Sequence, residues 1–163
     1  MFLRLSDLTL VFLIFVLFTA KLFKRTNIYN HSKTIQIMKK IIETKHAPAP
    51  VGPYNQAIIH NGTLYASGQI ALDPATGKLI IDNIETETHQ VMKNIQAVLT
   101  EAGITFENVI KCSVFVSDMN NYSRINAVYS EYFNDDTAPA RELVEVANLP
   151  KFVNIEISVI AAV

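Results

Sequence analysis

Residues 139–146 read Pro-Ala-Arg-Glu-Leu-Val-Glu-Val, and the rest of the chain can be organised around this stretch. Arg141 directly follows a Pro-Ala turn and opens an alternating run, which is typical of a strand. Its guanidinium is a planar fork of donors that matches a carboxylate through two parallel hydrogen bonds. The stretch therefore predicts a strand with an anion-binding group at its beginning.

A second stretch, residues 153–159, reads Val-Asn-Ile-Glu-Ile-Ser-Val and alternates strictly. Its apolar side chains fall on one face of a strand, while Asn154, Glu156 and Ser158 fall on the other. If the two strands are neighbours, Arg141 and Glu156 frame one small polar site. The residues alone leave another interpretation open, because charged side chains on an exposed strand face are ordinary and can be surface groups or a structural ion pair.

The remaining pattern predicts four more strands and two helices. Strands are expected at residues 39–44, 54–60, 63–67 and 109–116, and helices at residues 82–102 and 121–133. Asn61-Gly62 is a strong hairpin signal between the second and third strands. Asp82, with Glu85 three residues later, is typical of a capping box, and Gly103 is expected to cap the end of that helix. This order predicts an α+β domain with a single mixed β-sheet and both helices on one face.

Composition indicates a globular chain and excludes several classes of site. The 163 residues are 50% hydrophobic and 18% charged, which suits one domain or at most two. The only cysteine, Cys112, cannot form an internal disulfide and is expected to be a small buried residue. The four scattered histidines argue against a zinc site, so we expect no metal and no cofactor.

The charge of the chain depends on its first segment. Without residues 1–37, nine basic and fourteen acidic side chains remain, a net charge of −5. A domain of this charge offers no basic stripe to phosphates, so nucleic acid is not an expected partner. One well-placed arginine is enough for a small anionic substrate.

Residues 1–37 differ in character from the rest. Residues 8–20 form an uncharged run of thirteen residues, shorter than the about 18–20 needed to cross a bilayer. The length suits a signal peptide, but cleavage after Ala20 would put Phe18 where a small residue is required. We interpret the segment as an over-extended start before Met38, with a poor signal peptide or a short membrane anchor as alternatives. The domain is then residues 38–163, and it is cytoplasmic unless the extension is genuine.

Several short motifs occur in one order along residues 38–163. They are residues 46–57, 67–70, 126–129, 132–133, 139–141, 144–151 and 153–157. In order and spacing these motifs resemble the RidA family, also called YjgF or reactive intermediate deaminases. Each motif alone is a weak signal, and their agreement in order makes the resemblance specific.

The resemblance implies an assembly and a reaction. Members of this family are homotrimers of a chorismate-mutase-like fold, with open sheet faces meeting inside and three sites in the clefts between subunits. They hydrolyse reactive 2-enamine and 2-imine acids, such as 2-aminoacrylate and 2-aminocrotonate, to 2-oxo acids and ammonia. The reaction requires neither metal nor cofactor. Self-association also suits a short chain whose sheet has one uncovered face.

The resemblance also implies roles for individual residues. Arg141 would hold the substrate carboxylate, and Glu156 would orient a water molecule at the imine carbon and move a proton. Tyr54 would contribute its hydroxyl and an aromatic wall. These three are the expected catalytic residues.

Further contacts to the substrate are expected from the backbone. Ser67, Gly68 and Leu143 would supply hydrogen bonds, and Asn126 would help to shape either the pocket or the contact between subunits. The sequence departs from familiar members at Glu142-Leu143, where those members carry Ser-Cys. The missing thiol puts any thiol-dependent role in doubt, whereas the backbone of Leu143 can still bind.

Three other functions remain alternatives. A non-catalytic trimer that binds 2-oxo acids as a regulator would need Arg141 but not Glu156. A ribonuclease or translation inhibitor is disfavoured by the acidic charge. A chaperone-like surface has no specific residue to support it. A membrane is expected as a partner only if residues 1–37 are real.

Overall fold

The structure is a computed structural model that describes residues 39–163. The interpretation of residues 1–37, with its alternatives of a signal peptide or a membrane anchor, concerns residues outside this range. Within residues 39–163, no helix combines the length and the apolar character that crossing a membrane requires.

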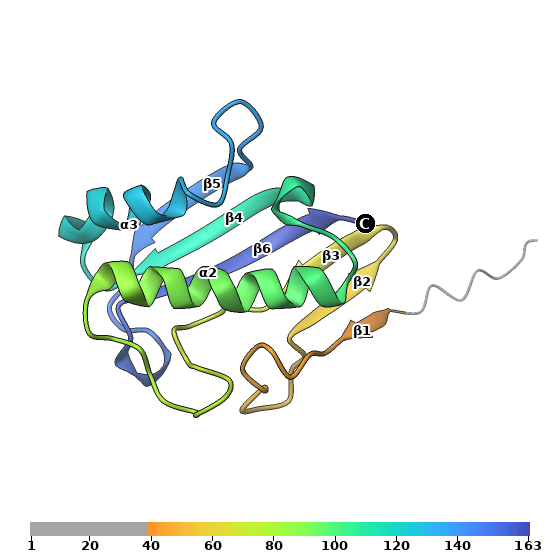
Figure 1. The fold of residues 1–163 in the computed structure, drawn as a ribbon, viewed down its shortest axis with the longest axis horizontal. Coiled ribbons are helices and arrows are strands. Elements are labelled where there is room, and N and C mark those ends of the chain that lie inside the picture. Colours follow the sequence, from red (N-terminus) through yellow and green to blue (C-terminus); the bar gives the residue numbers. More distant parts are fainter. Residues whose placement is uncertain (1–38) are drawn as a thin grey trace, which may run out of the picture. The chain divides into compact units, whose positions relative to one another are not determined.

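Six strands form one mixed sheet in the order β1-β2-β3-β6-β4-β5. The strands are β1 (Lys40–Ile42), β2 (Ala57–His60), β3 (Thr63–Ala66), β4 (Val109–Val116), β5 (Ala140–Glu145) and β6 (Ile155–Ala162). Only the β4–β5 pair is parallel, and the other neighbours are antiparallel. The helices α2 (Ile84–Glu101) and α3 (Tyr122–Tyr129) lie on the same face of this sheet (Figure 1). The predicted α+β fold, with one mixed sheet and two helices on one face, is confirmed.

The core lies between α2 and the side of the sheet that faces it. Val91, Ile95 and Val98 recur at helical spacing on α2 and are fully buried, as a stripe that faces a sheet must be. Along β6, burial alternates from residue to residue, as the pattern of residues 153–159 predicts. Cys112 is also fully buried, and burial raises the pKa of its thiol to about 11, which agrees with the expected packing role.

The predicted capping box at the start of α2 is wrong. Asn83 is the N-cap, and its Oδ1 accepts a hydrogen bond of 2.9 Å from the N–H of Thr86. With Asn83 as the N-cap, the residue three positions later is Thr86, so Glu85 is not placed to complete a capping box; it forms a bidentate pair with Arg124 of α3, at 2.6 Å for both contacts. Asp82 therefore lies outside the helix.

The ends of both helices also differ from their predicted positions. Gly103 has a φ of 80°, so a glycine does follow α2 in the left-handed conformation, one residue beyond the C-cap. The second helix, expected at residues 121–133, ends at Tyr129. Beyond it, the N–H of Tyr132 bonds to the carbonyl three residues back instead of four, so the α-helix does not continue. Phe133 still packs against Tyr129, with ring centroids 4.7 Å apart, and also contacts Phe106 edge-on at 5.2 Å.

The first connector is shaped by one buried amide. Gln56 accepts a hydrogen bond of 2.7 Å from the N–H of Thr44 and donates to the carbonyls of Thr44 and Ala47, at 2.9 and 3.1 Å. These side-chain bonds replace ladder bonds, which explains why β1 ends at Ile42 and β2 begins only at Ala57. The predicted strands at residues 39–44 and 54–60 are therefore too long.

The expectation that Arg141 and Glu156 lie on neighbouring strands is wrong. β4 runs between β5 and β6, and it pairs Cys112 with Arg141 and Phe115 with Glu156. Because cross-strand partners project to the same face, Arg141 lies on the helix side with Cys112, and Glu156 lies on the open side. The physical reason is the β4–α3–β5 crossover, which brings β5 in parallel to β4 at the edge of the sheet.

A buried carboxylate joins α2 to the start of β6. Glu87 is fully buried, and its two oxygens accept hydrogen bonds from the backbone N–H and the side-chain amide of Asn154, at 2.7 and 2.8 Å. Hydrogen bonds to a charged acceptor are stronger than neutral ones. This contact therefore fixes the chain just before the strand that carries Glu156.

We expect Glu87→Ala to lower the free energy of unfolding by about 2–3 kcal/mol, because both donors of Asn154 would be buried without a partner. Urea unfolding at a fixed protein concentration measures the loss. Glu101→Ala is the matched control, since Glu101 ends the same helix and is exposed, and it should change stability by less than about 0.5 kcal/mol. Equal unfolding midpoints for the two variants would contradict the structural role of Glu87.

Candidate functional site

The first group of candidate residues surrounds Arg141 at the start of β5. Its Nη1 donates a hydrogen bond of 2.9 Å to Oδ1 of Asn126, and its Cζ lies 4.6 Å from the centre of the Tyr129 ring. The hydroxyl of Tyr122 lies 3.5 Å from Nη2. We call Arg141, Asn126, Tyr129 and Tyr122 the Arg141 cluster. Its three α3 residues are spaced three and four positions apart, so they share one face of the helix.

The guanidinium of Arg141 keeps its charge available for a ligand. The ion pairs within residues 39–163 are His89–Glu131, Lys111–Glu142 and Arg124–Glu85, and none includes Arg141. An amide oxygen and an aromatic face orient the guanidinium without neutralising it. The arrangement suits the binding of an incoming carboxylate.

The role of Tyr129 beside Arg141 was missed in the sequence. Tyr129 is buried, with a relative exposure of 6%, as an apolar side chain on the inner face of a helix is expected to be. The same ring also supports the guanidinium. The spacing of Tyr122, Asn126 and Tyr129 on one helical face was a usable signal, but the contact with a residue in a later strand was not readable from it.

The second group surrounds Glu156 on the open face. A Cβ atom added to Gly68 would lie 1.8 Å from Oε1 and 2.7 Å from Cδ of Glu156, so only glycine leaves room for this carboxylate. Gln69 and Ile157 hold the two segments together through backbone hydrogen bonds of 2.8 and 3.1 Å. Burial raises the pKa of Glu156 above its ordinary value, because the charged form loses hydration.

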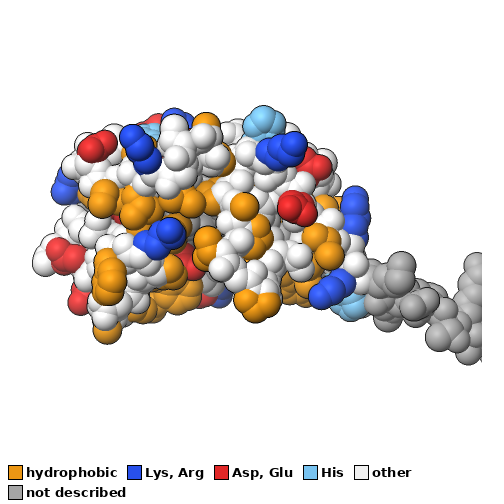
Figure 2. Space-filling view, turned by 90° about the horizontal axis from the view of Figure 1, so that it is seen from below, with side chains coloured by type: hydrophobic (Ala, Val, Ile, Leu, Met, Phe, Trp, Pro, Cys, Tyr) orange, Lys and Arg blue, Asp and Glu red, His pale blue; other side chains and the backbone are white. Residues whose placement is uncertain are grey.

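Tyr54 belongs to the second group because it lines a cavity together with Gly68, the residue next to the Glu156 carboxylate. Tyr54 and Gly68 line one small cavity of about 40 Å³, and Tyr54 is 48% exposed. The connector that carries Tyr54 lies at the lower edge of the ribbon in Figure 1, and Figure 2 shows that apolar side chains gather on this end of the molecule. We call Glu156, Gly68 and Tyr54 the Glu156 cluster.

Ser67 is held by the chain itself. Its hydroxyl donates to the carbonyl of Asn55 at 2.7 Å, and its N–H donates to the carbonyl of Gln56 at 2.9 Å. Both donors of Ser67 are thus engaged within the chain. Of the two predicted contact residues Ser67 and Gly68, Gly68 is the one that lies next to the Glu156 carboxylate. Ser67 fixes the connector beside β3.

Leu143 and Glu142 take opposite sides of β5. Leu143 pairs with Val114 and packs against the core, and its backbone lies on the edge strand of the sheet. The Glu142 side chain contacts Lys111 and Ser113 on the open face. These hydrogen bonds, that of Lys111 first, hold the pKa of Glu142 below its usual range. The residue that replaces the usual serine therefore forms a charged pair on the open face.

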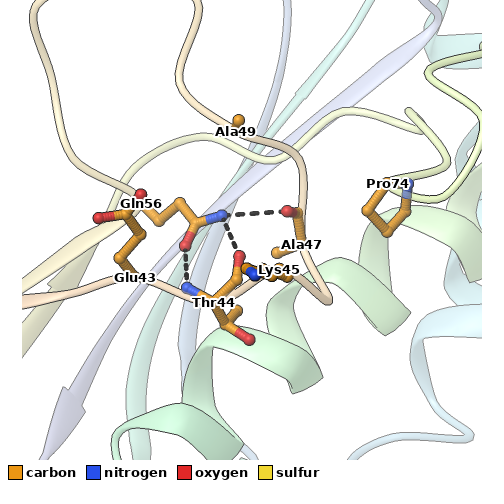
Figure 3. A pocket seen from close by; sticks show the side chains of 7 residues that line it. All are labelled: Glu43, Thr44, Lys45, Ala47, Ala49, Gln56 and Pro74. Atoms are coloured by element: carbon orange, nitrogen blue, oxygen red, sulfur yellow. Dashed lines mark hydrogen bonds between the residues drawn. The ribbon is translucent and has the colours of Figure 1, made fainter.

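A cavity elsewhere in the domain contains none of the predicted site residues. It measures about 420 Å³ and is lined by residues of the first connector, among them Glu43, Lys45 and Gln56, together with Pro74 (Figure 3). The Gln56 amide is directed at Thr44 and Ala47 and is satisfied by their backbone. This hollow therefore reflects the structure of the connector. Within residues 39–163, no three metal-ligating side chains come together.

Comparison with known proteins agrees with this fold. A solved structure of a conserved Rid family protein from Yersinia pestis superposes with a TM-score of 0.75 and 51% identity, covering 77% of this chain and all of the other. A Lactococcus lactis protein named as the regulator AldR is 56% identical over 124 residues, 76% of this chain and 98% of its own. The bovine protein named 2-iminobutanoate/2-iminopropanoate deaminase is 43% identical over 125 residues, 77% of this chain and 90% of its own.

These likenesses define a protein of the Rid type. The sequence model of the family described as endoribonuclease L-PSP matches residues 44–163. The chain belongs to this family, which includes the RidA, YjgF and RutC proteins. The resemblance seen in the sequence motifs is thereby confirmed.

We expect Gly68→Ala to turn the Glu156 carboxylate away from its present position, since the new methyl group would occupy the space of Oε1. The displaced atoms are the far end of a flexible side chain, so the free energy of unfolding should change by less than about 1.5 kcal/mol. A crystal structure of the variant shows the displacement. A carboxylate that keeps its position despite the added methyl group would contradict this account of the glycine.

Proposed function

We propose that the protein hydrolyses 2-imino acids and their 2-enamine tautomers to 2-oxo acids and ammonia. The observation that carries the proposal is the Arg141 guanidinium, which Asn126 and Tyr129 orient and which has no ion-pair partner within residues 39–163. Such a group suits the carboxylate of a small acid. The name of the bovine relative denotes this activity.

The proposed reaction needs two copies of the chain. The carboxylate carbon of a 2-imino acid is bonded directly to the imine carbon, so the groups that act on the two must meet in one small site. Arg141 and Glu156 lie on opposite faces of the sheet within one copy. We therefore propose that the Arg141 cluster of one copy meets the Glu156 cluster of the next. Three such head-to-tail contacts close a trimeric ring.

The open sheet face supports this assembly. Ile41, Ile58, Tyr65 and Ile160 are aligned across four neighbouring strands on that face. Ile41 and Tyr65 remain 51% and 45% exposed in the single chain. A row of apolar side chains on one sheet face gains free energy when a second surface excludes water from it.

The proposed mechanism uses few groups. Arg141 binds the carboxylate of the substrate and so fixes its imine carbon. A water molecule held by Glu156 adds to that carbon, and Glu156 accepts a proton from the water and passes it to the imine nitrogen. Glu156 then takes the hydroxyl proton of the resulting carbinolamine and gives it to the amine nitrogen, so that the C–N bond breaks and ammonia and the 2-oxo acid are released. Burial raises the pKa of Glu156 above its ordinary value, which is the direction that favours a group that both accepts and donates a proton.

A regulator that binds 2-oxo acids is the second candidate, because a relative 56% identical to this chain is named as one. That function uses Arg141 and makes no demand on Glu156. The ribonuclease denoted by the family description finds less support, since residues 38–163 carry a net charge of −5.

Substitutions at Arg141 and Glu156 separate these functions. Arg141→Ala and Arg141→Lys should weaken binding of 2-oxobutanoate by about a hundredfold, because the bidentate charge-assisted contact contributes about 3 kcal/mol. Glu156→Gln keeps size and polarity but removes the proton acceptor. It should lower kcat for ammonia release from 2-aminocrotonate by about 10²–10⁴-fold and leave 2-oxobutanoate binding nearly unchanged.

Calorimetry with 2-oxobutanoate and an ammonia-release assay with 2-aminocrotonate generated in situ provide the two measurements. Full turnover by Glu156→Gln would refute the general-base role and favour the regulator. Normal 2-oxobutanoate binding by Arg141→Ala would show that the site lies elsewhere in the chain. Arg124→Lys, on the exposed pair between the helices, is the control and should leave both measurements unchanged.

The assembly is tested by light scattering, which should give about three times the mass of one chain. Tyr65→Lys places a charge in the apolar row and should shift the protein toward the monomer, whereas Gln96→Lys, on the exposed side of α2, should not. A stable wild-type monomer at micromolar concentration would refute the trimer and the shared site.

A further inference from the structure

A cavity of about 330 Å³ lies beside Arg141, between the end of α3 and residues 134–139. A substrate carboxylate bound to Arg141 would occupy only part of this space, which is of the size that binds small molecules. Phe133, Ala138 and Pro139 give the cavity apolar walls. The remaining room is therefore suited to the side chain of the substrate.

The same cavity contains a negative charge. Asp135 lines it together with Arg141, and no ion pair between the two is formed within residues 39–163. Arg141 can thus bind the substrate carboxylate while Asp135 keeps its own charge. Asp135 is itself exposed, and a second carboxylate on the substrate would face this like charge across the same cavity, where the two repel.

We infer that Asp135 determines the substrate specificity of the site. The enzyme accepts 2-imino acids with apolar or uncharged side chains and rejects those that carry a second carboxylate. This inference rests on the proposed deamination and adds the substrate class to it. Rejection by a placed charge is an effective route to specificity, because it disfavours the diacid more than the monoacid, whose single carboxylate is bound by Arg141.

The neighbouring aspartate provides a matched control. Asp136 is exposed, carries the same charge and is not among the residues that line the cavity. Asp136→Asn therefore changes the net charge of the protein by the same amount as Asp135→Asn. A difference between the two variants isolates the effect of the position from that of the total charge.

The experiment compares two imines generated in situ by amino-acid oxidases, that of 2-oxobutanoate and that of 2-oxoglutarate. For wild-type protein, kcat/KM for the first should exceed that for the second. Asp135→Asn should reduce this ratio by about tenfold, which corresponds to about 1.4 kcal/mol, by raising kcat/KM for the diacid. Asp136→Asn should leave the ratio within about twofold of wild type. Equal ratios for the two variants would overturn the inference.

Binding of the stable products separates this inference from the proposed function. Calorimetry measures the affinities of 2-oxobutanoate and 2-oxoglutarate without any turnover. If no imine is hydrolysed but Asp135→Asn alone improves 2-oxoglutarate binding, deamination is refuted and the specificity role of Asp135 is supported. If wild type binds both acids equally, or binds neither, the role of Asp135 is overturned whether or not imines are hydrolysed.

Discussion

The candidate site depends on the position of β4 between β6 and β5. A parallel strand can be reached only by a crossover, and α3 is part of the crossover from β4 to β5. The crossover puts β5 at the edge of the sheet and lays Asn126 and Tyr129 against Arg141. The crossover also places Arg141 and Glu156 on opposite faces of the sheet, with β4 between their strands. The connection that orients Arg141 is therefore also the reason why the proposed chemistry requires a second copy of the chain.

Three glutamates show how their neighbours set the behaviour of the same side chain. Glu87 is buried and accepts two hydrogen bonds from Asn154, which makes it part of the scaffold. Glu142 contacts Lys111, and its pKa is lowered, so it remains charged. Glu156 is partly buried against Gly68 without such a partner among residues 39–163, and its pKa is raised. Of the three, Glu156 has the environment of a group that exchanges protons.

The Arg141 cluster and the cavity beside it combine attraction and repulsion. In the proposed function, the guanidinium attracts a carboxylate from solution and the apolar walls accept a small side chain, and the inferred role of Asp135 is to oppose a second negative charge. A small site in an acidic domain can therefore still favour a monoanion, because the arrangement of a few charges within the cavity matters more than the total charge.

The sequence by itself determined the types of the main elements, the α+β class, the family and the face of Glu156. Strict alternation over residues 153–159 could be read because one face of that strand is buried and the other is not. The run that Arg141 opens predicted a strand, but burial along residues 140–145 does not alternate, since an edge strand is only half covered, so the face of Arg141 was not readable. Tertiary structure alone decided which strands are neighbours and how α3 supports Arg141, because these depend on contacts between residues far apart in the chain, which local periodicity does not encode.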